Sequence, residues 1–329
     1  MTGSGVAVII VSWNASVLLG GVLDALARQT LAPRLVLVVD NGSDDAEVTA
    51  ALLAVRTGVE WFPLPDNRGF AAANNLGIAR CTDVEFIALL NPDAFPRPEW
   101  LARLVSAAKA NPELGGFASR LLCYDNPGIL DGVGDCMSIY GKPRRRGHGI
   151  KADGLFLKPE SVFCPSAAAA LYRRQALVEV GGFDEDYFCY VEDVDLGFRL
   201  RLAGHKAMYV PDAVVHHVGS ATTGGQHSDF SVYHGHRNLV WAFVKNMPGA
   251  LFWLLLPLHV MLNLASIIWF VLQGRGRVIL RAKRDALLGL PKMWRKRKHI
   301  QRSRVASIGE IWLQLDKRMI TTTSSRKEI

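Results

Sequence analysis

Residues 35–56 read LVLVVDNGSDDAEVTAALLAVR, and this stretch decides the fold. Its first five residues are apolar and rich in valine, which is typical of a buried β-strand. The polar loop DNGSDD follows at 40–45, and a helical pattern runs from Asp44 to Arg56. A buried strand that leads through a short polar loop into a helix is the repeating unit of a parallel sheet covered by helices.

The same alternation continues in both directions along the chain. We predict strands at 6–11, 35–39, 59–64 and 85–90, and helices at 16–28, 44–56, 70–80 and 98–110. The region 119–160 looks irregular, a further helix ends near residue 203, and 213–217 is extended. The sequence therefore predicts an α/β fold with a mostly parallel sheet flanked by helices.

The composition indicates an acidic body and a basic tail. The chain has 329 residues, half of them hydrophobic, which suits one large domain with an appendage or two domains. From Gln273 onward 16 Lys and Arg stand against 4 Asp and Glu, a balance of +12; the remainder has 22 against 26, a balance of −4. Such tails bind phosphates, on either nucleic acids or lipids.

The cysteines and the N-terminus favour a cytosolic protein. The five cysteines are scattered, and no two are spaced as C-x-x-C. A zinc site of ordinary spacing is therefore not expected, and reduced thiols are the simpler interpretation. The N-terminal MTGSGVAVIIVSWN lacks basic residues and has only a short apolar run, so we interpret it as a first strand rather than a signal peptide.

Polar residues follow three of the predicted strands, at the edge where parallel sheets bind ligands. Asp40 could accept hydrogen bonds from a ribose or a base, although its Asn-Gly successor also favours a plain hairpin turn. NPDAF at 91–95 places Asp93 after the fourth strand, or forms only an Asx turn. After the first strand comes SWN, in which Trp13 either stacks on a base or fills the core.

A fourth polar segment, DNRGFAAANN at 66–75, lies between these strand ends. Gly69 and the alanines would let a ligand approach closely, and Asn67 and Asn75 offer neutral hydrogen bonds. A tightly packed helix start is the alternative. The chain has neither a G-x-G-x-x-G fingerprint nor a P-loop, so the sequence supports neither a dinucleotide fold nor a P-loop site.

Two kinds of side chain could hold a metal ion. Asp93 and one histidine of the pair His216–His217 are suitable ligands for Mn²⁺ or Mg²⁺. Such an ion commonly neutralises the charge on a departing phosphate. The basic sequence KPRRRGHG at 142–149 is either a solvated loop or a flap over an anionic ligand.

The stretch YVEDVDLGFR at 190–199 gathers three carboxylates, Glu192, Asp193 and Asp195, among apolar residues. Their mutual repulsion and their burial are both costly, unless a cation lies nearby. They could instead be acids at a helix N-terminus, which the helix dipole favours by up to about 1 kcal/mol. A carboxylate kept ionised but moderately basic suits a general base, and Asp193 is our candidate.

Four ordered segments resemble family 2 glycosyltransferases, and more narrowly bacterial rhamnosyltransferases that extend lipid-linked glycans. They are VVDNGSDD at 38–45, DNRGFAAANN at 66–75, LLNPDA at 89–94 and VGGFDEDYFCYVEDVDLGFRLRLAGHKAMYVPDAVVHH at 180–217. The resemblance covers about residues 6–245. It implies a GT-A fold and an inverting displacement from a nucleotide-diphosphate sugar.

The resemblance also implies roles for single residues. Asp93 would be the metal-binding acid of the D-x-D motif, although Asn91 replaces its first acid. His217 would be the second metal ligand, with His216 as its competitor, and Asp193 matches the catalytic base. The residues expected to bind the nucleotide sugar are Val11 and Trp13 beside the base, Asp40 at the nucleoside, and Asn67, Gly69 and Asn75.

The expected function is a metal-dependent transfer of L-rhamnose from dTDP-L-rhamnose to a polyprenyl-diphosphate-linked saccharide, with Mg²⁺ or Mn²⁺ as cofactor. A UDP-sugar is the alternative donor. A sugar nucleotidyltransferase is an enzymatic rival, but it would show a Gly-rich, Arg-containing loop where this chain has SWNAS. A basic membrane or nucleic-acid adaptor without turnover is the rival from another class.

Residues 251–272 are apolar and long enough to span a bilayer, but they include Pro257 and have basic residues on both sides. We therefore expect a monotopic or re-entrant element broken near Pro257, with a single span as the alternative. The tail at 281–304 mixes bases with Leu, Met and Trp, which favours an anionic membrane surface over nucleic acid. The expected domains are a catalytic domain at residues 1–235 and a membrane-associated helical region with a basic tail at 236–329. We expect the protein at the cytoplasmic face of the bacterial inner membrane.

Overall fold

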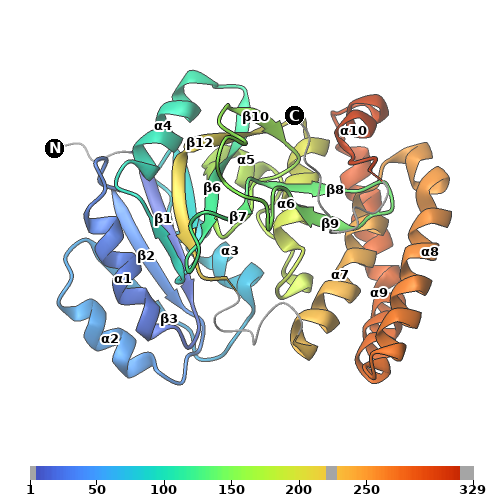
Figure 1. The fold of residues 1–329 in the computed structure, drawn as a ribbon, viewed down its shortest axis with the longest axis horizontal. Coiled ribbons are helices and arrows are strands. Elements are labelled where there is room, and N and C mark those ends of the chain that lie inside the picture. Colours follow the sequence, from blue (N-terminus) through green and yellow to red (C-terminus); the bar gives the residue numbers. More distant parts are fainter. Residues whose placement is uncertain (1–4, 220–227, 319–329) are drawn as a thin grey trace.

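The computed structural model, which describes residues 5–219 and 228–318, is built around one mixed β-sheet (Figure 1). The strand order is β3–β2–β1–β4–β11–β6–β12–β10, and two short strands, β5 and β7, pair with β12 and β6. The strands are β1 Val6–Ser12, β2 Leu35–Asp40, β3 Val59–Pro63, β4 Phe86–Leu90, β5 Ala94–Pro96, β6 Leu114–Cys123, β7 Leu130–Gly132, β10 Glu160–Val162, β11 Ala169–Arg173 and β12 Lys206–His217.

The first half of the sheet is parallel, as the sequence predicts. β1 pairs in parallel with β2 and β4, and β2 pairs in parallel with β3. The expected α/β fold is confirmed. Beyond β4 the sheet is mixed: β6 and β12 pair in parallel, but antiparallel strands lie beside them. There β11 runs antiparallel between β4 and β6, and β10 runs antiparallel to β12. The sequence AALYR of β11 has two alanines, which are weak strand formers, so no pattern indicated this strand.

Helices cover both faces of the sheet, because alternate residues of a strand point to opposite sides. Val8 packs in one cluster with Leu19 of α1 and Trp100 of α4, whereas Ile9 packs in another with residues of α3, α5 and α6. This burial on both faces explains why the strands are continuous apolar runs. The helices are α1 Ser16–Ala27, α2 Ala46–Ala54, α3 Phe70–Arg80, α4 Trp100–Ala110, α5 Arg174–Glu179 and α6 Glu192–Leu202.

The region 119–160, which looked irregular, contains short strands that connect the sheet to the C-terminal helices. β8 Asp135–Met137 and β9 Pro143–Arg145 form a separate hairpin. Near its tip, the Nδ1 of His259 lies 2.7 Å from the carbonyl oxygen of Tyr140. Gly141 has a φ of +77°, and a Cβ there would lie 2.6 Å from the ring of Phe243. All five cysteines are free thiols, as expected.

The C-terminal region consists of α7 Asp229–Asn246, α8 Gly249–Leu272, α9 Gly276–Arg302 and α10 Ile308–Gln314. The predicted domain boundary at residue 235 falls inside α7. After α10 the chain returns to the β8–β9 hairpin, where the backbone N–H of Asp316 donates to the carbonyl of Met137 (2.8 Å). Residues 319–329, the end of the basic tail, lie outside the described residues.

Helix α8 contains the apolar stretch and runs without interruption through Pro257. The predicted break near Pro257 is therefore wrong. A proline removes one hydrogen bond from a helix and its ring needs space, and Pro257 lies on the exposed side of α8, where the ring disturbs no packed neighbour. In the described part of the chain α8 is the one helix long and apolar enough to cross a membrane, judged by length and composition.

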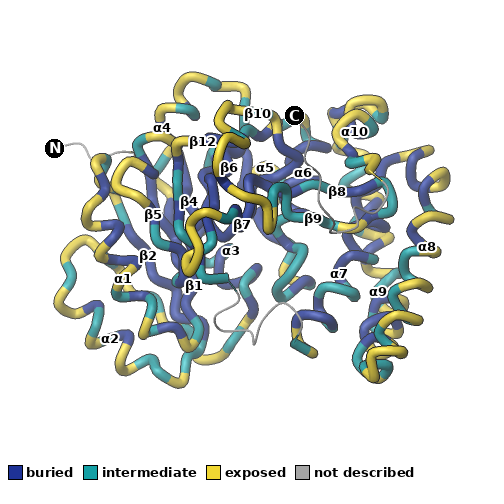
Figure 2. The backbone as a smooth tube through the Cα atoms, in the orientation of Figure 1, coloured by how far each residue is buried: buried dark blue, intermediate teal, exposed yellow. Residues whose placement is uncertain are grey.

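Helix α9 runs back beside α8 (Figure 1). The rings of Phe252 and Trp294 lie 5.6 Å apart, and farther along the pair the Nζ of Lys283 lies 2.5 Å from the Oδ1 of Asn263. The other side of α8 is uncovered, as the yellow segments of Figure 2 show. Large apolar side chains are more than 60% exposed there, among them Trp253, Leu254, Met261, Ile268, Trp269 and Leu272.

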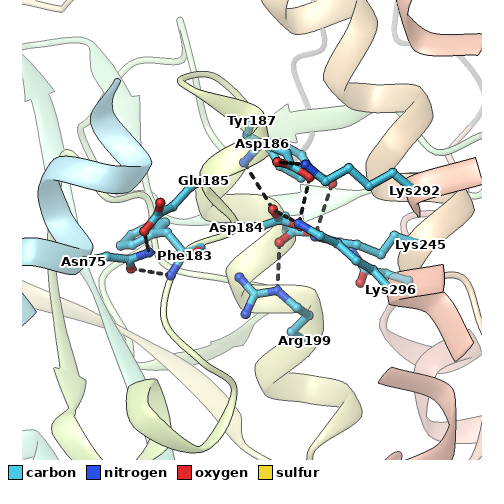
Figure 3. A network of polar contacts seen from close by, with 12 residues as sticks. Asn75, Phe183, Asp184, Glu185, Asp186, Tyr187, Arg199, Lys245, Lys292 and Lys296 are labelled. Atoms are coloured by element: carbon cyan, nitrogen blue, oxygen red, sulfur yellow. Dashed lines mark hydrogen bonds and ion pairs between the residues drawn. The ribbon is translucent and has the colours of Figure 1, made fainter. Parts of the chain in front are cut away.

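A buried cluster of ion pairs joins the sheet domain to these helices (Figure 3). Asp195 of α6 lies between Lys245 of α7 (2.7 Å) and Arg199 (2.8 Å). Asp184 pairs with the same Lys245 and with Lys296 of α9. Burial alone would raise the pKa of Asp195, but the charges of Lys245 and Arg199 outweigh it and lower that pKa. The cluster therefore holds α6, α7 and α9 together through ionised groups.

We predict that Lys245→Ala lowers the free energy of unfolding by about 3–5 kcal/mol, because it leaves two buried aspartates without their shared cation. Lys292→Ala is the matched control. Lys292 pairs with Asp186 at 2.6 Å, but its side chain is 55% exposed, so its loss should cost about 1 kcal/mol or less. Urea unfolding of the purified variants measures both. An equal loss in the two variants would contradict the central role of Lys245.

Candidate active site

A pocket of about 360 Å³ lies at the carboxyl ends of the parallel strands. Its walls come from the ends of β1, β4 and β12, from the loops that follow β2 and β3, from β9 and from the start of α6. The sequence-predicted residues that line it are Val11, Trp13, Asn67, Gly69, Asn91, Asp93, Asp193 and His217. Segments far apart in the chain therefore meet here, as expected for strand ends that share one sheet edge.

Asp40 does not line the pocket but is buried next to it, at the end of β2. Its Oδ1 accepts a hydrogen bond from the backbone N–H of Ser43 (3.0 Å), whereas its Oδ2 has no hydrogen-bond partner among the described residues. In the β1–β2 register Asp40 is opposite Ser12, whose hydroxyl also lacks a partner in that part of the chain. Buried polar atoms without partners are costly, so a ligand that donates hydrogen bonds here would be stabilised.

The three residues predicted from DNRGFAAANN have different surroundings. The Oδ1 of Asn67 accepts from the side chain of Asn41 and from the N–H of Gly69, both at 2.9 Å, so it shapes the loop. Gly69 has a φ of +85°, and a Cβ there would lie 2.6 Å from the ring of Phe188. Its small size therefore makes room for the ring of Phe188.

Asn75, also predicted to bind the nucleotide sugar, lies outside the pocket lining. Its amide group donates to the Phe183 carbonyl and to Glu185 and accepts from the Phe183 N–H, at 2.8–2.9 Å (Figure 3). These bonds use both ends of the amide and fix the loop before α6. We therefore interpret Asn75 as a structural residue.

Strand pairing brings Asp93 and His217 together. β5 pairs antiparallel with the end of β12, so His217 is opposite Ala94 and adjacent to Asp93. The Nε2 of His217 lies 3.3 Å from the Oδ1 of Asp93. His216 points to the other side of the strand, where its Nε2 accepts a hydrogen bond from Arg97 (3.3 Å). Of the two histidines, only His217 lines the pocket.

The second nitrogen of His217 is held by a residue that the sequence did not indicate. Its Nδ1 lies 2.7 Å from the Oδ2 of Asp131, on β7. Asp131 is itself held by Arg145 at 2.7 Å and by His148 at 3.4 Å. Burial lowers the pKa of His217, but its hydrogen bonds to Asp131 and Asp93 and their charges raise it more, to about 9.

The donor set at this point fits a divalent cation with few protein ligands. A carboxylate oxygen and an imidazole nitrogen lie side by side and line the pocket, and both can bind Mn²⁺ or Mg²⁺ once the ion displaces the proton of that nitrogen. Within residues 5–219 and 228–318 no group of three or more His, Cys, Asp or Glu side chains is arranged for a metal ion. Such an ion would therefore need further oxygens from a bound ligand or from water.

The acidic cluster of 192–195 is divided between the pocket and the core. Asp193 lines the pocket, where its Oδ1 accepts from the N–H of Val194 (2.8 Å) and its Oδ2 from the N–H of Ala167 (3.3 Å). Burial raises the pKa of Asp193 above its usual value, against the effect of these bonds. Burial and the charge of Asp193 raise the pKa of Glu192 much further. Asp195 faces away, into the ion-pair cluster.

The backbone before α6 is in an unfavourable conformation. Phe188, Tyr190 and Val191 have φ values of +66°, +64° and +69°. This region of the Ramachandran plot is sparsely populated by non-glycine residues, and a β-branched residue there is a clear outlier. Strain of this kind persists only where the surrounding structure enforces it, and it clusters at functional sites.

Asp131 and Asp135 are the pocket-related residues that the sequence reasoning missed, whereas Arg145 belongs to the basic segment 142–149 that was considered as a flap. Asp135 and Arg145 line the pocket, and burial with the nearby charge of Asp193 raises the pKa of Asp135 to about 8. One signal could have found the two acids. They flank GVG in the segment LDGVGD at 130–135, in which carboxylates alternate with small and apolar residues.

Comparison with known proteins agrees with this geometry. The family model "Glycosyl transferase family 2" matches residues 7–181. The N-acetylglucosaminyl-diphospho-decaprenol L-rhamnosyltransferase of Mycobacterium tuberculosis is 31% identical over 248 residues, which are 69% of this chain and 80% of that protein. The O-antigen chain rhamnosyltransferase RfbN of Salmonella typhimurium is 28% identical over 214 residues, with 64% and 66% covered.

A solved structure shows the same fold. The mannosyltransferase PcManGT from Pyrobaculum calidifontis, in complex with GDP-Man and Mn²⁺, superposes with a TM-score of 0.55 at 19% identity, over 92% of this chain and 85% of that one. These matches argue against the two alternative functions considered above, an adaptor without turnover and a sugar nucleotidyltransferase. The chain belongs to glycosyl transferase family 2 and is a glycosyltransferase with a GT-A-type fold.

Proposed function

We propose that this glycosyltransferase moves L-rhamnose from dTDP-L-rhamnose, with inversion, onto a polyprenyl-diphosphate-linked saccharide. One observation carries the proposal: the Asp193 carboxylate and the Asp93–His217 pair line the same pocket at the strand ends. A base for the acceptor and a cation site for the leaving diphosphate are the two things an inverting transfer from a nucleotide sugar requires.

The nucleotide is expected at the ends of β1 and β2. Trp13 and Val11 line the pocket there and suit a base, and the unpartnered Oδ2 of Asp40 suits a hydrogen-bond donor of the nucleoside. The names of the relatives from Mycobacterium and Salmonella support rhamnose as the sugar. A UDP-sugar is the second candidate. Donor hydrolysis across dTDP- and UDP-sugars with Mn²⁺ distinguishes them, and no hydrolysis of dTDP-L-rhamnose would overturn the first.

Asp93 and His217 would hold Mg²⁺ or Mn²⁺, and the bound ion would supply positive charge for the diphosphate. The protein's own step is a proton transfer. The Asp193 carboxylate takes the proton of an acceptor hydroxyl as its oxygen attacks the anomeric carbon. The bond from that carbon to the diphosphate oxygen breaks on the opposite side, and its electron pair leaves with the nucleotide. Donation by the N–H groups of Val194 and Ala167 keeps Asp193 oriented for this step.

A lipid-linked acceptor calls for a membrane beside the pocket, and α8 supports a monotopic arrangement. If α8 crossed the bilayer, α9 alongside it would place its ten Lys and Arg residues in hydrocarbon, which is strongly unfavourable. If α8 instead lies in one leaflet, its uncovered apolar side is buried and the bases remain at headgroup level. Since the chain after α9 returns to the β8–β9 hairpin, both ends of the helical region lie on one side. Nucleotide sugars make that side the cytoplasmic face of the inner membrane.

We predict that Asp193→Asn lowers kcat by about 10²-fold or more, the usual contribution of a general base. Asparagine has the same shape as aspartate and keeps one oxygen that accepts a hydrogen bond from a backbone N–H, so nucleotide binding should change little. Steady-state transfer and titration calorimetry with dTDP measure the two effects. Near-normal turnover of a folded Asp193→Asn enzyme would remove this residue from the mechanism.

A second prediction concerns the ligand set of the metal. Asp131→Asn should weaken Mn²⁺ binding about 10- to 100-fold, because an amide no longer holds the His217 ring as a carboxylate does. Asp93→Ala should weaken it further. Asp125→Asn, an exposed acid nearby, is the control. Free Mn²⁺ counted by electron paramagnetic resonance gives the affinity without any assay of activity. Equal affinities in the Asp125 and Asp131 variants would show that Asp131 has no such role.

The membrane arrangement predicts the effect of charge on α8. Replacing Leu254, Met261 and Ile268 by lysine should abolish flotation with anionic liposomes, since each of these side chains is more than 60% exposed on the uncovered side. The control places three lysines at Val17 on α1, Val48 on α2 and Val55 directly after α2, which are at least 59% exposed but lie away from α8. Should both triple variants float like the unmodified protein, α8 is not the membrane anchor.

A further inference from the structure

The pocket has an aromatic side that the donor and the metal do not use. Phe188, Tyr190 and Phe230 all line it, and we call these three residues the aromatic wall. The ring of Phe230 lies 6.3 Å from that of Phe188 and 6.2 Å from that of Tyr190. His234 stacks on Phe188 at 5.3 Å. Burial and the charge of Arg237 lower the pKa of His234 to about 4, so its ring is neutral at pH 7.

The aromatic wall is held in place by α7. The side-chain amide of Asn238 lies 2.8–2.9 Å from three carbonyl oxygens, those of Tyr187, Cys189 and Tyr190. These bonds span the residues whose φ values are positive. Asn238 thus offsets the strain of a backbone that presents two rings to the pocket, next to Glu192 and Asp193. A conformation this unfavourable indicates that the position of these rings matters for function.

Cationic groups lie directly beyond the aromatic wall. Asp229, the neighbour of Phe230, pairs with Arg275 in the turn between α8 and α9. One turn farther along α7, the guanidinium of Arg281 lies 4.9 Å from the ring of Tyr233, and its side chain is 68% exposed. Guanidinium groups are the preferred partners of phosphate oxygens. Beyond them, the uncovered side of α8 is apolar.

We propose that this succession is the acceptor site: the aromatic wall binds the pyranose ring that carries the reacting hydroxyl, and Arg281, with Arg275, binds the diphosphate. The inference rests on the proposed function. Its support is that the groups follow one another in the order of the acceptor's own parts. Asp193 would contact the hydroxyl, the aromatic rings would contact the sugar, and the guanidinium groups would bind the diphosphate. Helix α8 would lie where the prenyl chain enters the membrane.

Aromatic rings suit a sugar here better than they suit a prenyl chain. A pyranose has an apolar face of C–H groups that packs on a flat ring, while its hydroxyls point outward to polar partners. The aromatic wall borders Asp193, whose role requires a hydroxyl within hydrogen-bond reach. A prenyl chain at the same place would separate Asp193 from every hydroxyl of the acceptor.

The test uses the full-length enzyme, dTDP-L-rhamnose and two acceptor probes. One probe is N-acetylglucosamine linked through diphosphate to farnesol, and the other is the octyl glycoside of N-acetylglucosamine, which has no phosphate. Phe230→Ala should raise KM about 10-fold for both probes, and Phe230→Tyr should restore it. Arg281→Gln should raise KM about 10-fold for the diphosphate probe alone. Arg284→Gln is the control, since Arg284 is 67% exposed on the same helix and also contacts Asp285.

The outcomes separate this inference from the proposed function. If the unmodified enzyme transfers sugar and Phe230→Ala leaves both KM values unchanged, the aromatic wall is not the sugar site. If Phe230→Ala affects only the diphosphate probe, the rings hold the prenyl chain, and the assignment is overturned. An equal effect of Arg281→Gln and Arg284→Gln overturns the diphosphate site. Absence of transfer to both probes by the unmodified enzyme refutes the proposed acceptor, and this site with it.

Discussion

The buried contact between Asp195 and Lys245 is the interaction on which the active site depends. Successive residues of a helix are about 100° apart, so Asp193 and Asp195 on the first turn of α6 face nearly opposite directions. One carboxylate reaches the pocket, and the other reaches α7 at 2.7 Å. Without the contact between Asp195 and Lys245, no ion pair to α7 among the described residues would fix the rotation of α6 about its own axis. The position of the candidate base is thus set by an ion pair on the far side of its helix.

This constraint makes the C-terminal helices part of the catalytic unit. Lys245 belongs to α7 and Lys296 to α9, and Asp184 contacts both of them (Figure 3). A buried ion pair is weak evidence for net stability, because desolvation offsets much of the attraction. It is better evidence for specificity, since only one arrangement of α6, α7 and α9 satisfies every charge. The same three helices carry Asp193, Phe230 of the aromatic wall and Arg281, so one arrangement aligns the candidate base with the proposed acceptor site.

The sequence predicts the parts of the fold that depend on local periodicity. The alternation of strands and helices up to α4 is correct within about two residues, because buried parallel strands are unmistakable apolar runs. The sequence-based prediction fails for β7, β8 and β9, which have three residues each and form only by pairing with other segments. Asp131 and Asp135 lie there, so both were missed. The choice between His216 and His217 needed the register of β5 on β12, which no local pattern contains.

The acidic cluster shows how a core can hold several carboxyl groups. Glu192 and Asp135 are buried and Asp193 is half-buried around one pocket, and the three cannot all be ionised. The hydrogen bonds decide where the charge resides. Glu192 has a buried oxygen without a hydrogen-bond partner in the described chain, which favours its neutral form, whereas Asp193 accepts two backbone N–H bonds, which favour its ionised form. The negative charge therefore concentrates on Asp193, and its neighbours keep the pKa of that carboxylate high enough for it to accept a proton.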